Sequence, residues 1–125
     1  MRNSLLSPSP WLRLGALPTK LSVMNISAKA AYHTLERFQV VDVREPEEWA
    51  EGVLPGALRL PLSKLETLAP LYLEREQPVL LYCRSGNRSQ EALQKLQRLG
   101  HPKVWHLEGG IRAWREAGLP CASPV

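Results

Sequence analysis

The 125-residue chain has few cysteines, no metal-binding motif and no long apolar run. Its two cysteines, Cys83 and Cys121, are too few for a disulfide framework. CxxC, HExxH and Cys/His clusters are all missing, so the sequence predicts no metal and no other cofactor. A membrane-spanning helix needs about 20 apolar residues, and these runs reach only a few. We therefore expect a globular domain without a cofactor or a membrane partner.

Carboxylates are absent from the first 35 residues, which carry a charge of +4 from Arg2, Arg13, Lys20 and Lys29. The formal charge of the whole chain is also +4, so residues 36–125 are neutral overall. A nucleic-acid-binding protein needs a basic face on its folded body. The sequence pI of about 9.4 is therefore misleading, and we expect no nucleic-acid partner.

Residues 1–23 differ in composition from the rest, because three prolines and several serines interrupt any helical pattern. We expect a disordered leader here, or a true translation start at Met24. The alternative is a transit peptide, which would direct the protein to mitochondria; otherwise we expect a cytoplasmic protein. The sequence predicts one domain over residues 24–121 and a short tail over 122–125.

Short apolar runs alternate with helical patterns after Met24. The runs predict strands at 39–43, 57–60, 78–82 and 103–107. Helical patterns cover residues from a cap at Ser27 to about 37, a turn at 46–49, a segment from a cap at Ser63 to about 68, and 89–99 and 110–117. Such alternation is typical of an α/β fold: a single domain whose mainly parallel sheet carries helices on both faces.

The loop after the most apolar strand carries the candidate chemistry. Cys83 ends that strand and is followed within seven residues by Arg84, Gly86, Arg88 and the start of helix 89–99. Two positive charges and the unpaired N–H groups of a helix N-terminus favour a thiolate over a thiol. Gly86 allows the backbone to turn its N–H groups inward as an anion nest. The pattern favours a reactive thiolate over a buried structural cysteine.

The segment 83–89, Cys-Arg-Ser-Gly-Asn-Arg-Ser, resembles the active-site loop of the rhodanese family of single-domain sulfurtransferases. The resemblance covers about residues 24–120. Three more segments match in order: VDVREPEEW at 41–49, GVLPGA at 52–57 and LEGGIRAW at 107–114. Val53 stands where the family usually has histidine. Since the family places that position outside the cysteine loop, this departure affects packing rather than chemistry.

The resemblance implies a sulfur transfer in which Cys83 becomes a persulfide. The sulfur would come from a small anionic donor, thiosulfate or a persulfide, and would pass to cyanide or a thiol. Backbone N–H groups of the loop would hold the persulfide. Arg84 and Arg88 are the predicted donor-binding side chains, with Arg88 turned further inward. The full set of predicted substrate-binding residues is Arg84, Ser85, Gly86, Asn87, Arg88 and Ser89.

Two other functions use the same loop. One is a relay module that passes sulfur to a single protein partner and turns over little free substrate. The other is a regulatory module without catalysis, against which the retained Cys83, Gly86 and two arginines argue. Related cysteine phosphatases place five residues between their cysteine and arginine, whereas four separate Cys83 from Arg88. The shorter loop suits a single sulfur atom better than a phosphate.

The remaining polar residues receive supporting or structural interpretations. Asp42 and Arg44 end the first strand, where we expect them to pair or to brace the cysteine loop. The three histidines, His33, His101 and His106, are scattered, and we interpret each as structural or solvated. Cys121 lies in a proline-containing segment and is interpreted as an incidental exposed thiol.

Overall fold

The computed structural model describes residues 24–123, so the predictions made for residues 1–23 and for the last two positions lie outside the described residues. Among the described residues, no helix is long and apolar enough to cross a membrane. The elements follow in the order β1 Asn25–Ile26, α2 Ala28–Thr34, η1 Leu35–Arg37, β2 Gln39–Asp42, α3 Pro46–Trp49, β3 Leu58–Arg59, η2 Leu62–Lys64, α4 Leu65–Tyr72, β4 Val79–Tyr82, α5 Asn87–Arg98, β5 Val104–Leu107 and α6 Gly110–Glu116.

All five strands belong to one sheet in the order β1-β5-β4-β2-β3, and every neighbouring pair is parallel. The predicted α/β fold is thereby confirmed. β4 lies at the centre between β2 and β5, and all its residues are buried. Ligands in such sheets bind beyond the carboxyl ends of the strands. Cys83, which directly follows β4, therefore stands at the middle of the edge where a site is expected.

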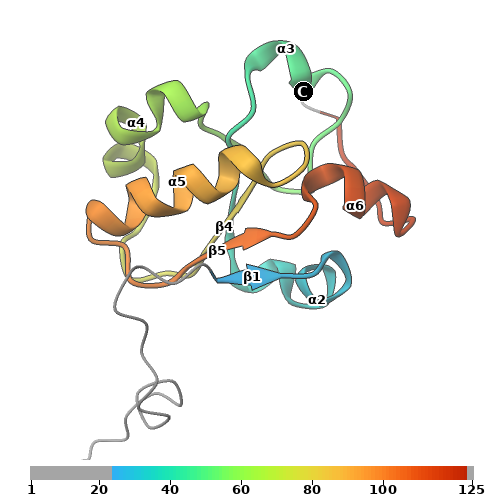
Figure 1. The fold of residues 1–125 in the computed structure, drawn as a ribbon, viewed down its shortest axis with the longest axis horizontal. Coiled ribbons are helices and arrows are strands. Elements are labelled where there is room, and N and C mark those ends of the chain that lie inside the picture. Colours follow the sequence, from blue (N-terminus) through green and yellow to red (C-terminus); the bar gives the residue numbers. More distant parts are fainter. Residues whose placement is uncertain (1–23, 124–125) are drawn as a thin grey trace, which may run out of the picture.

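The two faces of the sheet carry separate apolar cores, each covered by helices (Figure 1). Along β4, Val79 and Leu81 face the core under α4 and α5, while Leu80 and Tyr82 face the core under α2 and α6. The alternation continues past the strand, so Cys83 joins the core on the α4 and α5 side. The period of the strand thus sends the thiol toward the N-terminus of α5.

Three predicted helix boundaries are wrong. Ser63 caps nothing; it lies within η2, and α4 runs on to Tyr72 with Pro70 inside it. Burial of Leu65 and Ala69 against the sheet outweighs the hydrogen bond that Pro70 cannot donate. α5 begins at Asn87, two residues before the predicted start. The sequence also gave no sign of β1, which has only two residues. Ser27 does cap α2, through a 3.2 Å hydrogen bond from the Ala30 N–H.

A buried polar network lies at the end of β2. Asp42 is fully buried and accepts two short hydrogen bonds through Oδ2, at 2.7 Å from Arg44 Nη2 and at 2.7 Å from the Tyr82 hydroxyl. The Tyr82 oxygen in turn accepts the N–H of Leu54 at 3.0 Å. Burial and the neighbouring Asp42 carboxylate both raise the pKa of Tyr82, so the phenol stays protonated and donates to Asp42. The network ties the sheet to the loop before β3.

We expect Tyr82→Phe to lower the free energy of unfolding by about 1–3 kcal/mol, because the buried N–H of Leu54 loses its acceptor. Urea denaturation measures the change. Tyr72→Phe is the matched control, since Tyr72 is 57% exposed, and it should cost almost nothing. Equal stability of the two variants would show that the Tyr82 hydroxyl is not needed.

Candidate active site

Cys83 is a free thiol whose side chain lies in the bend between β4 and α5. The residue is only 1% exposed. The backbone N–H of Gly86 donates to Sγ at 3.0 Å. Gly86 has φ +117°, a left-handed conformation that favours glycine, and it caps the N-terminus of α5. A sulfur at this position accepts a hydrogen bond from a backbone N–H and lies beside the positive end of a helix dipole.

The predicted loop residues divide into an outer and an inner set. Arg84, Ser85 and Asn87 are exposed, whereas Gly86 and Ser89 are buried. The Ser89 hydroxyl lies 3.6 Å from Cys83 Sγ and 3.1 Å from the carbonyl oxygen of Gly86. Ser89 is therefore the side chain of the loop that contacts the sulfur, and the exposed residues form the outer wall of the site.

The start of α6 packs directly on the cysteine loop. The N–H of Ile111 donates to the carbonyl of Cys83 at 2.9 Å, and the N–H of Arg112 donates to that of Arg84 at 3.2 Å. These bonds satisfy N–H groups that a helix N-terminus leaves without partners. Gly110 makes the approach possible, because a Cβ there would lie 2.5 Å from the Cys83 oxygen and closer still to that of Arg84. Gly110, the first residue of α6, thus allows the helix to fix the loop from behind.

Arg88 is half-buried whereas Arg84 is exposed, and Arg88 pairs with the carboxylate of Glu48. Its two terminal nitrogens bind the two Glu48 oxygens at 2.7 and 2.9 Å. Hydrogen bonding to Arg88 lowers the pKa of Glu48 to about 2. At neutral pH the positive charge of Arg88 is therefore largely compensated.

Asp42 and Arg44 bind one another, and Arg44 also binds the segment that carries Glu48. Besides Asp42, the guanidinium donates to the backbone carbonyls of Glu48 at 3.2 Å and of Gly52 at 2.8 Å. Arg44 is 1% exposed although it is charged. The pair thus fastens residues 45–52, and the Glu48–Arg88 ion pair connects that segment to the N-terminus of α5. No bond from either residue to the cysteine loop is found within residues 24–123.

His106, which the sequence interprets as structural or solvated, is buried close to the cysteine loop. Its Nδ1 lies 3.0 Å from the Ser89 hydroxyl, which contacts Cys83 Sγ. Burial lowers the pKa of His106, so the ring is neutral at physiological pH. Sequence reasoning missed His106 and Glu48 because each meets the loop from another element. One signal was available: parallel neighbours of the cysteine strand bring their own ends to the same edge.

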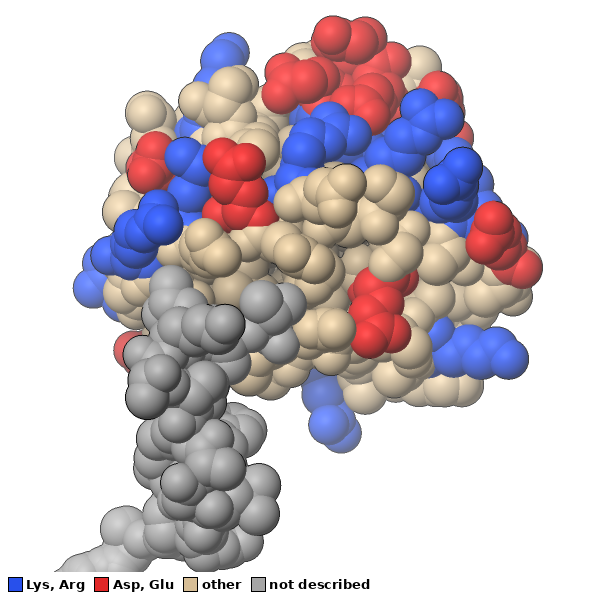
Figure 2. Space-filling model, in the orientation of Figure 1, with Lys and Arg blue, Asp and Glu red and all other residues tan. Residues whose placement is uncertain are grey.

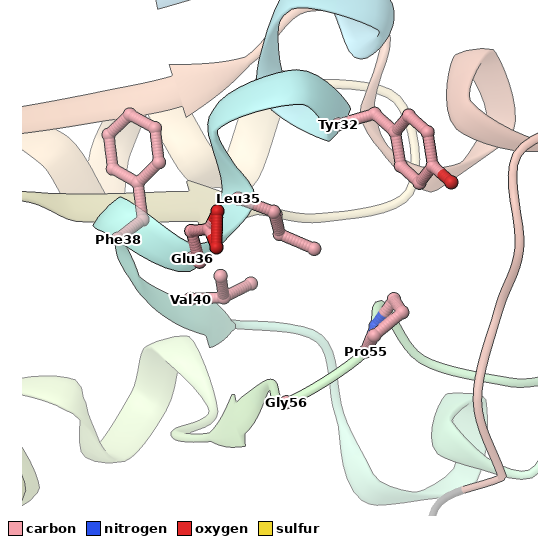
Figure 3. A pocket seen from close by; sticks show the side chains of 7 residues that line it. All are labelled: Tyr32, Leu35, Glu36, Phe38, Val40, Pro55 and Gly56. Carbon is pink, nitrogen blue, oxygen red and sulfur yellow. The ribbon is translucent and has the colours of Figure 1, made fainter.

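Figure 2 shows acidic side chains gathered over α3 and basic side chains in the band beside them. An open pocket of about 570 Å³ lies elsewhere, between the end of α2, η1 and the 55–56 turn (Figure 3). None of residues 83–89 lines it. Within the described part of the chain, no group of three or more His, Cys, Asp or Glu side chains could hold a metal ion.

Comparison with known proteins gives a consistent result. The model of the rhodanese-like domain family matches residues 27–117. A protein of Allochromatium vinosum named "Sulfurtransferase" is 41% identical over 85 residues, which are 68% of this chain and 78% of that protein. The crystal structure of a rhodanese-related protein from Thermoplasma volcanium superimposes with a TM-score of 0.74 at 35% identity, covering 78% of this chain and 96% of the other.

The human single-domain sulfurtransferase TSTD1 is a further structural neighbour, with a TM-score of 0.68 at 29% identity. The aligned part covers 76% of this chain and 97% of the human protein. Several other curated relatives are longer: the chain spans 45%, 60% and 22% of three of them. For those relatives the similarity concerns one part of the protein.

We expect Gly110→Ala to disrupt the cysteine loop, because the new methyl group would collide with the carbonyls of Cys83 and Arg84. Gly118→Ala is the matched control: Gly118 also has positive φ, and a Cβ there would meet no atom within 4 Å. We predict that the free energy of unfolding falls by about 1–2 kcal/mol in the control and by about 2–4 kcal/mol in Gly110→Ala, as measured by thermal or urea unfolding. Equal losses would mean that close packing at Gly110 is unimportant.

The Glu48–Arg88 pair predicts an acid-dependent stability. Because the pKa of Glu48 is lowered from 4.5 to about 2, the pair stabilises the fold above about pH 4.5 and is lost as the pH falls toward 2. Between pH 4.5 and pH 2, the free energy of unfolding of the wild type should fall by about 1 kcal/mol more than that of Glu48→Gln. This figure allows for solvent screening of the partly exposed side chains. Denaturant unfolding at several pH values measures the difference.

Glu66→Gln is the control for this measurement, since Glu66 is 57% exposed and lies 3.4 Å from Lys95. Its stability should follow that of the wild type across the acid range. A difference between the wild type and Glu48→Gln that stays constant from pH 5 to pH 2 would contradict the prediction.

Proposed function

The chain belongs to the rhodanese-like domain family, and on that premise we propose that it is a sulfurtransferase carrying sulfur as a persulfide of Cys83. One observation supports the proposal most directly. At the N-terminus of α5, Cys83 Sγ accepts a hydrogen bond of 3.0 Å from the backbone N–H of Gly86. A sulfur that must act first as a nucleophile and later as a leaving group needs an environment that stabilises its anion.

The proposed first step is an attack of the Cys83 thiolate on the outer sulfur of thiosulfate. A sulfur–sulfur bond forms at Cys83, the sulfur–sulfur bond of thiosulfate breaks, and sulfite leaves with the electron pair. In the second step cyanide or a thiolate attacks the outer sulfur of the persulfide, and Cys83 leaves as a thiolate. No net oxidation or proton uptake at the protein is required, which agrees with a site built from one cysteine and hydrogen-bond donors.

Arg84 is the best candidate for contact with the anionic donor. It is exposed on the outer wall of the loop and has no ion-pair partner among residues 24–123. Arg88 contributes less charge to a donor, because Glu48 compensates it through two hydrogen bonds. We assign to Arg88 mainly the orientation of the first turn of α5. The sequence interpretation differs, since there both arginines bind the donor and Arg88 is turned further inward.

The acceptor is a small thiol, cyanide or the thiol of a partner protein. A persulfide on Cys83 would lie in a loop whose Ser85 and Asn87 are exposed to solvent, so acceptors would approach from that side. Rates with cyanide, with glutathione and with a partner thiol distinguish these cases. Slow transfer to both small acceptors, with fast transfer to a protein thiol, would favour the relay function.

We expect thiosulfate to add one sulfur atom to the protein and cyanide to remove it, with formation of thiocyanate. Intact-mass spectrometry measures the first change, and a colorimetric thiocyanate assay measures turnover. Cys83→Ser should abolish both, because the nucleophile is lost. Cys121→Ser is the matched control, since Cys121 is a free exposed thiol, and it should retain both.

Sulfur uptake that persists in Cys83→Ser and vanishes in Cys121→Ser would overturn the assignment of the nucleophile. Failure of the wild type to gain sulfur from thiosulfate, together with ready gain from a low-molecular-weight persulfide, would instead identify a persulfide as the donor.

A further inference from the structure

His106 lies in β5, and its ring reaches the cysteine site through Ser89. The residue is 3% exposed, and Nδ1 lies 3.0 Å from the Ser89 hydroxyl oxygen. Ser89 Oγ is in turn 3.6 Å from Cys83 Sγ. The side chains of His106, Ser89 and Cys83 therefore form a continuous chain of contacts. The proposed sulfur chemistry uses only Cys83.

The register of the sheet explains why these groups meet. β5 is parallel to β4, and His106 pairs with Leu81, two residues before Cys83. Val104, two residues before His106, belongs to the core under α4 and α5, while the alternate residue Leu107 belongs to the other core. The His106 ring therefore projects from the same face of the sheet as Cys83, toward the first turn of α5.

The unpaired nitrogen of the ring indicates where its proton lies. Nε2 is buried and has no hydrogen-bond partner within the described residues. A buried N–H without an acceptor is rarer in proteins than a buried acceptor without a donor. The favoured neutral form therefore carries its proton on Nδ1 and donates it to Ser89. Burial lowers the pKa of His106 despite the opposing charge of Glu108, which keeps the ring neutral.

The hydrogen bond from His106 determines which acceptors remain for the hydrogen of the Ser89 hydroxyl. Its oxygen accepts from His106, so its single hydrogen is free for either of two acceptors, the Gly86 carbonyl at 3.1 Å or Cys83 Sγ at 3.6 Å. Beside a neutral thiol, the hydroxyl donates to the carbonyl, and the thiol donates to the hydroxyl. Beside a thiolate, the negative sulfur is the stronger acceptor, and rotation of the hydroxyl turns its hydrogen toward Sγ.

We propose that His106 is a positioning residue, whose Nδ1–H holds the Ser89 hydroxyl as a hydrogen-bond donor to the Cys83 thiolate. The inference rests on the proposed function of Cys83 as the nucleophile. In the step it supports, the thiol proton leaves to water, the Ser89 hydrogen moves from the Gly86 oxygen to Sγ, and His106 keeps its proton. No charge is created on the ring, which agrees with its burial.

The test measures the rate of Cys83 alkylation by iodoacetamide against pH, in a Cys121→Ser background so that one thiol reacts. His106→Leu removes the donor, and we expect the midpoint of the pH profile to rise by about one pH unit, with alkylation near neutral pH about tenfold slower. The plateau rate at high pH should stay unchanged, because access to the sulfur is the same. A merely structural role would alter the plateau instead.

His106→Asn provides the rescue, since an asparagine amide nitrogen occupies nearly the place of Nδ1 and can donate to Ser89. Its profile should lie close to that of the parent. His106→Gln places its amide near the Nε2 position and should behave like His106→Leu; it replaces that variant if leucine prevents folding. In a Ser89→Ala background, His106→Leu should have no further effect on the midpoint, because the intermediary is gone.

An unchanged midpoint in folded His106→Leu or His106→Gln would overturn the proposal, as would an equal shift with and without Ser89. Alkylation requires no sulfur donor. A parent protein that shows the expected midpoints but takes up no sulfur from thiosulfate or a persulfide would therefore contradict the proposed function and leave the positioning role intact.

Discussion

The buried charge of Arg44 is the constraint on which this end of the sheet depends. A guanidinium that is 1% exposed is tolerated only where its hydrogen bonds are made, because leaving it unpaired would cost several kcal/mol. Arg44 therefore requires Asp42 and the carbonyls of residues 48 and 52 to stay in place. That requirement fixes α3, and α3 presents Glu48 to Arg88. A charge remote from the sulfur thus helps to determine how α5 begins.

The cysteine site combines side chains from two neighbouring parallel strands and one helix, so no single sequence motif contains it. β4 supplies Cys83, its neighbour β5 supplies His106, and the helix that follows β4 supplies Ser89 between them. The first turn of α6 closes the loop from the opposite side, where the N–H groups of Ile111 and Arg112 donate to the carbonyls of Cys83 and Arg84. Each element is held by its own core contacts, so the geometry at the sulfur follows from packing across the whole domain.

The sequence was sufficient wherever the signal is local. Apolar runs indicated a parallel sheet, and the strand, thiol, glycine and helix start indicated the loop around Cys83. It was insufficient where a contact joins distant segments: Glu48 and Arg88 are 40 residues apart, and Ser89 and His106 are 17 apart. No periodicity encodes such pairs. The same limit explains the wrong end of α4, where burial of Ala69 outweighs the helix-breaking tendency of Pro70.

The burial of Cys83 separates the reactivity of the sulfur from its accessibility. With 1% of the residue exposed, Cys83 is shielded from solvent although the hydrogen bond from Gly86 favours its thiolate. Cys121, by contrast, is exposed to solvent. On the proposed function, the same burial would shield a persulfide on Cys83 from water and oxidants in the interval between donor and acceptor.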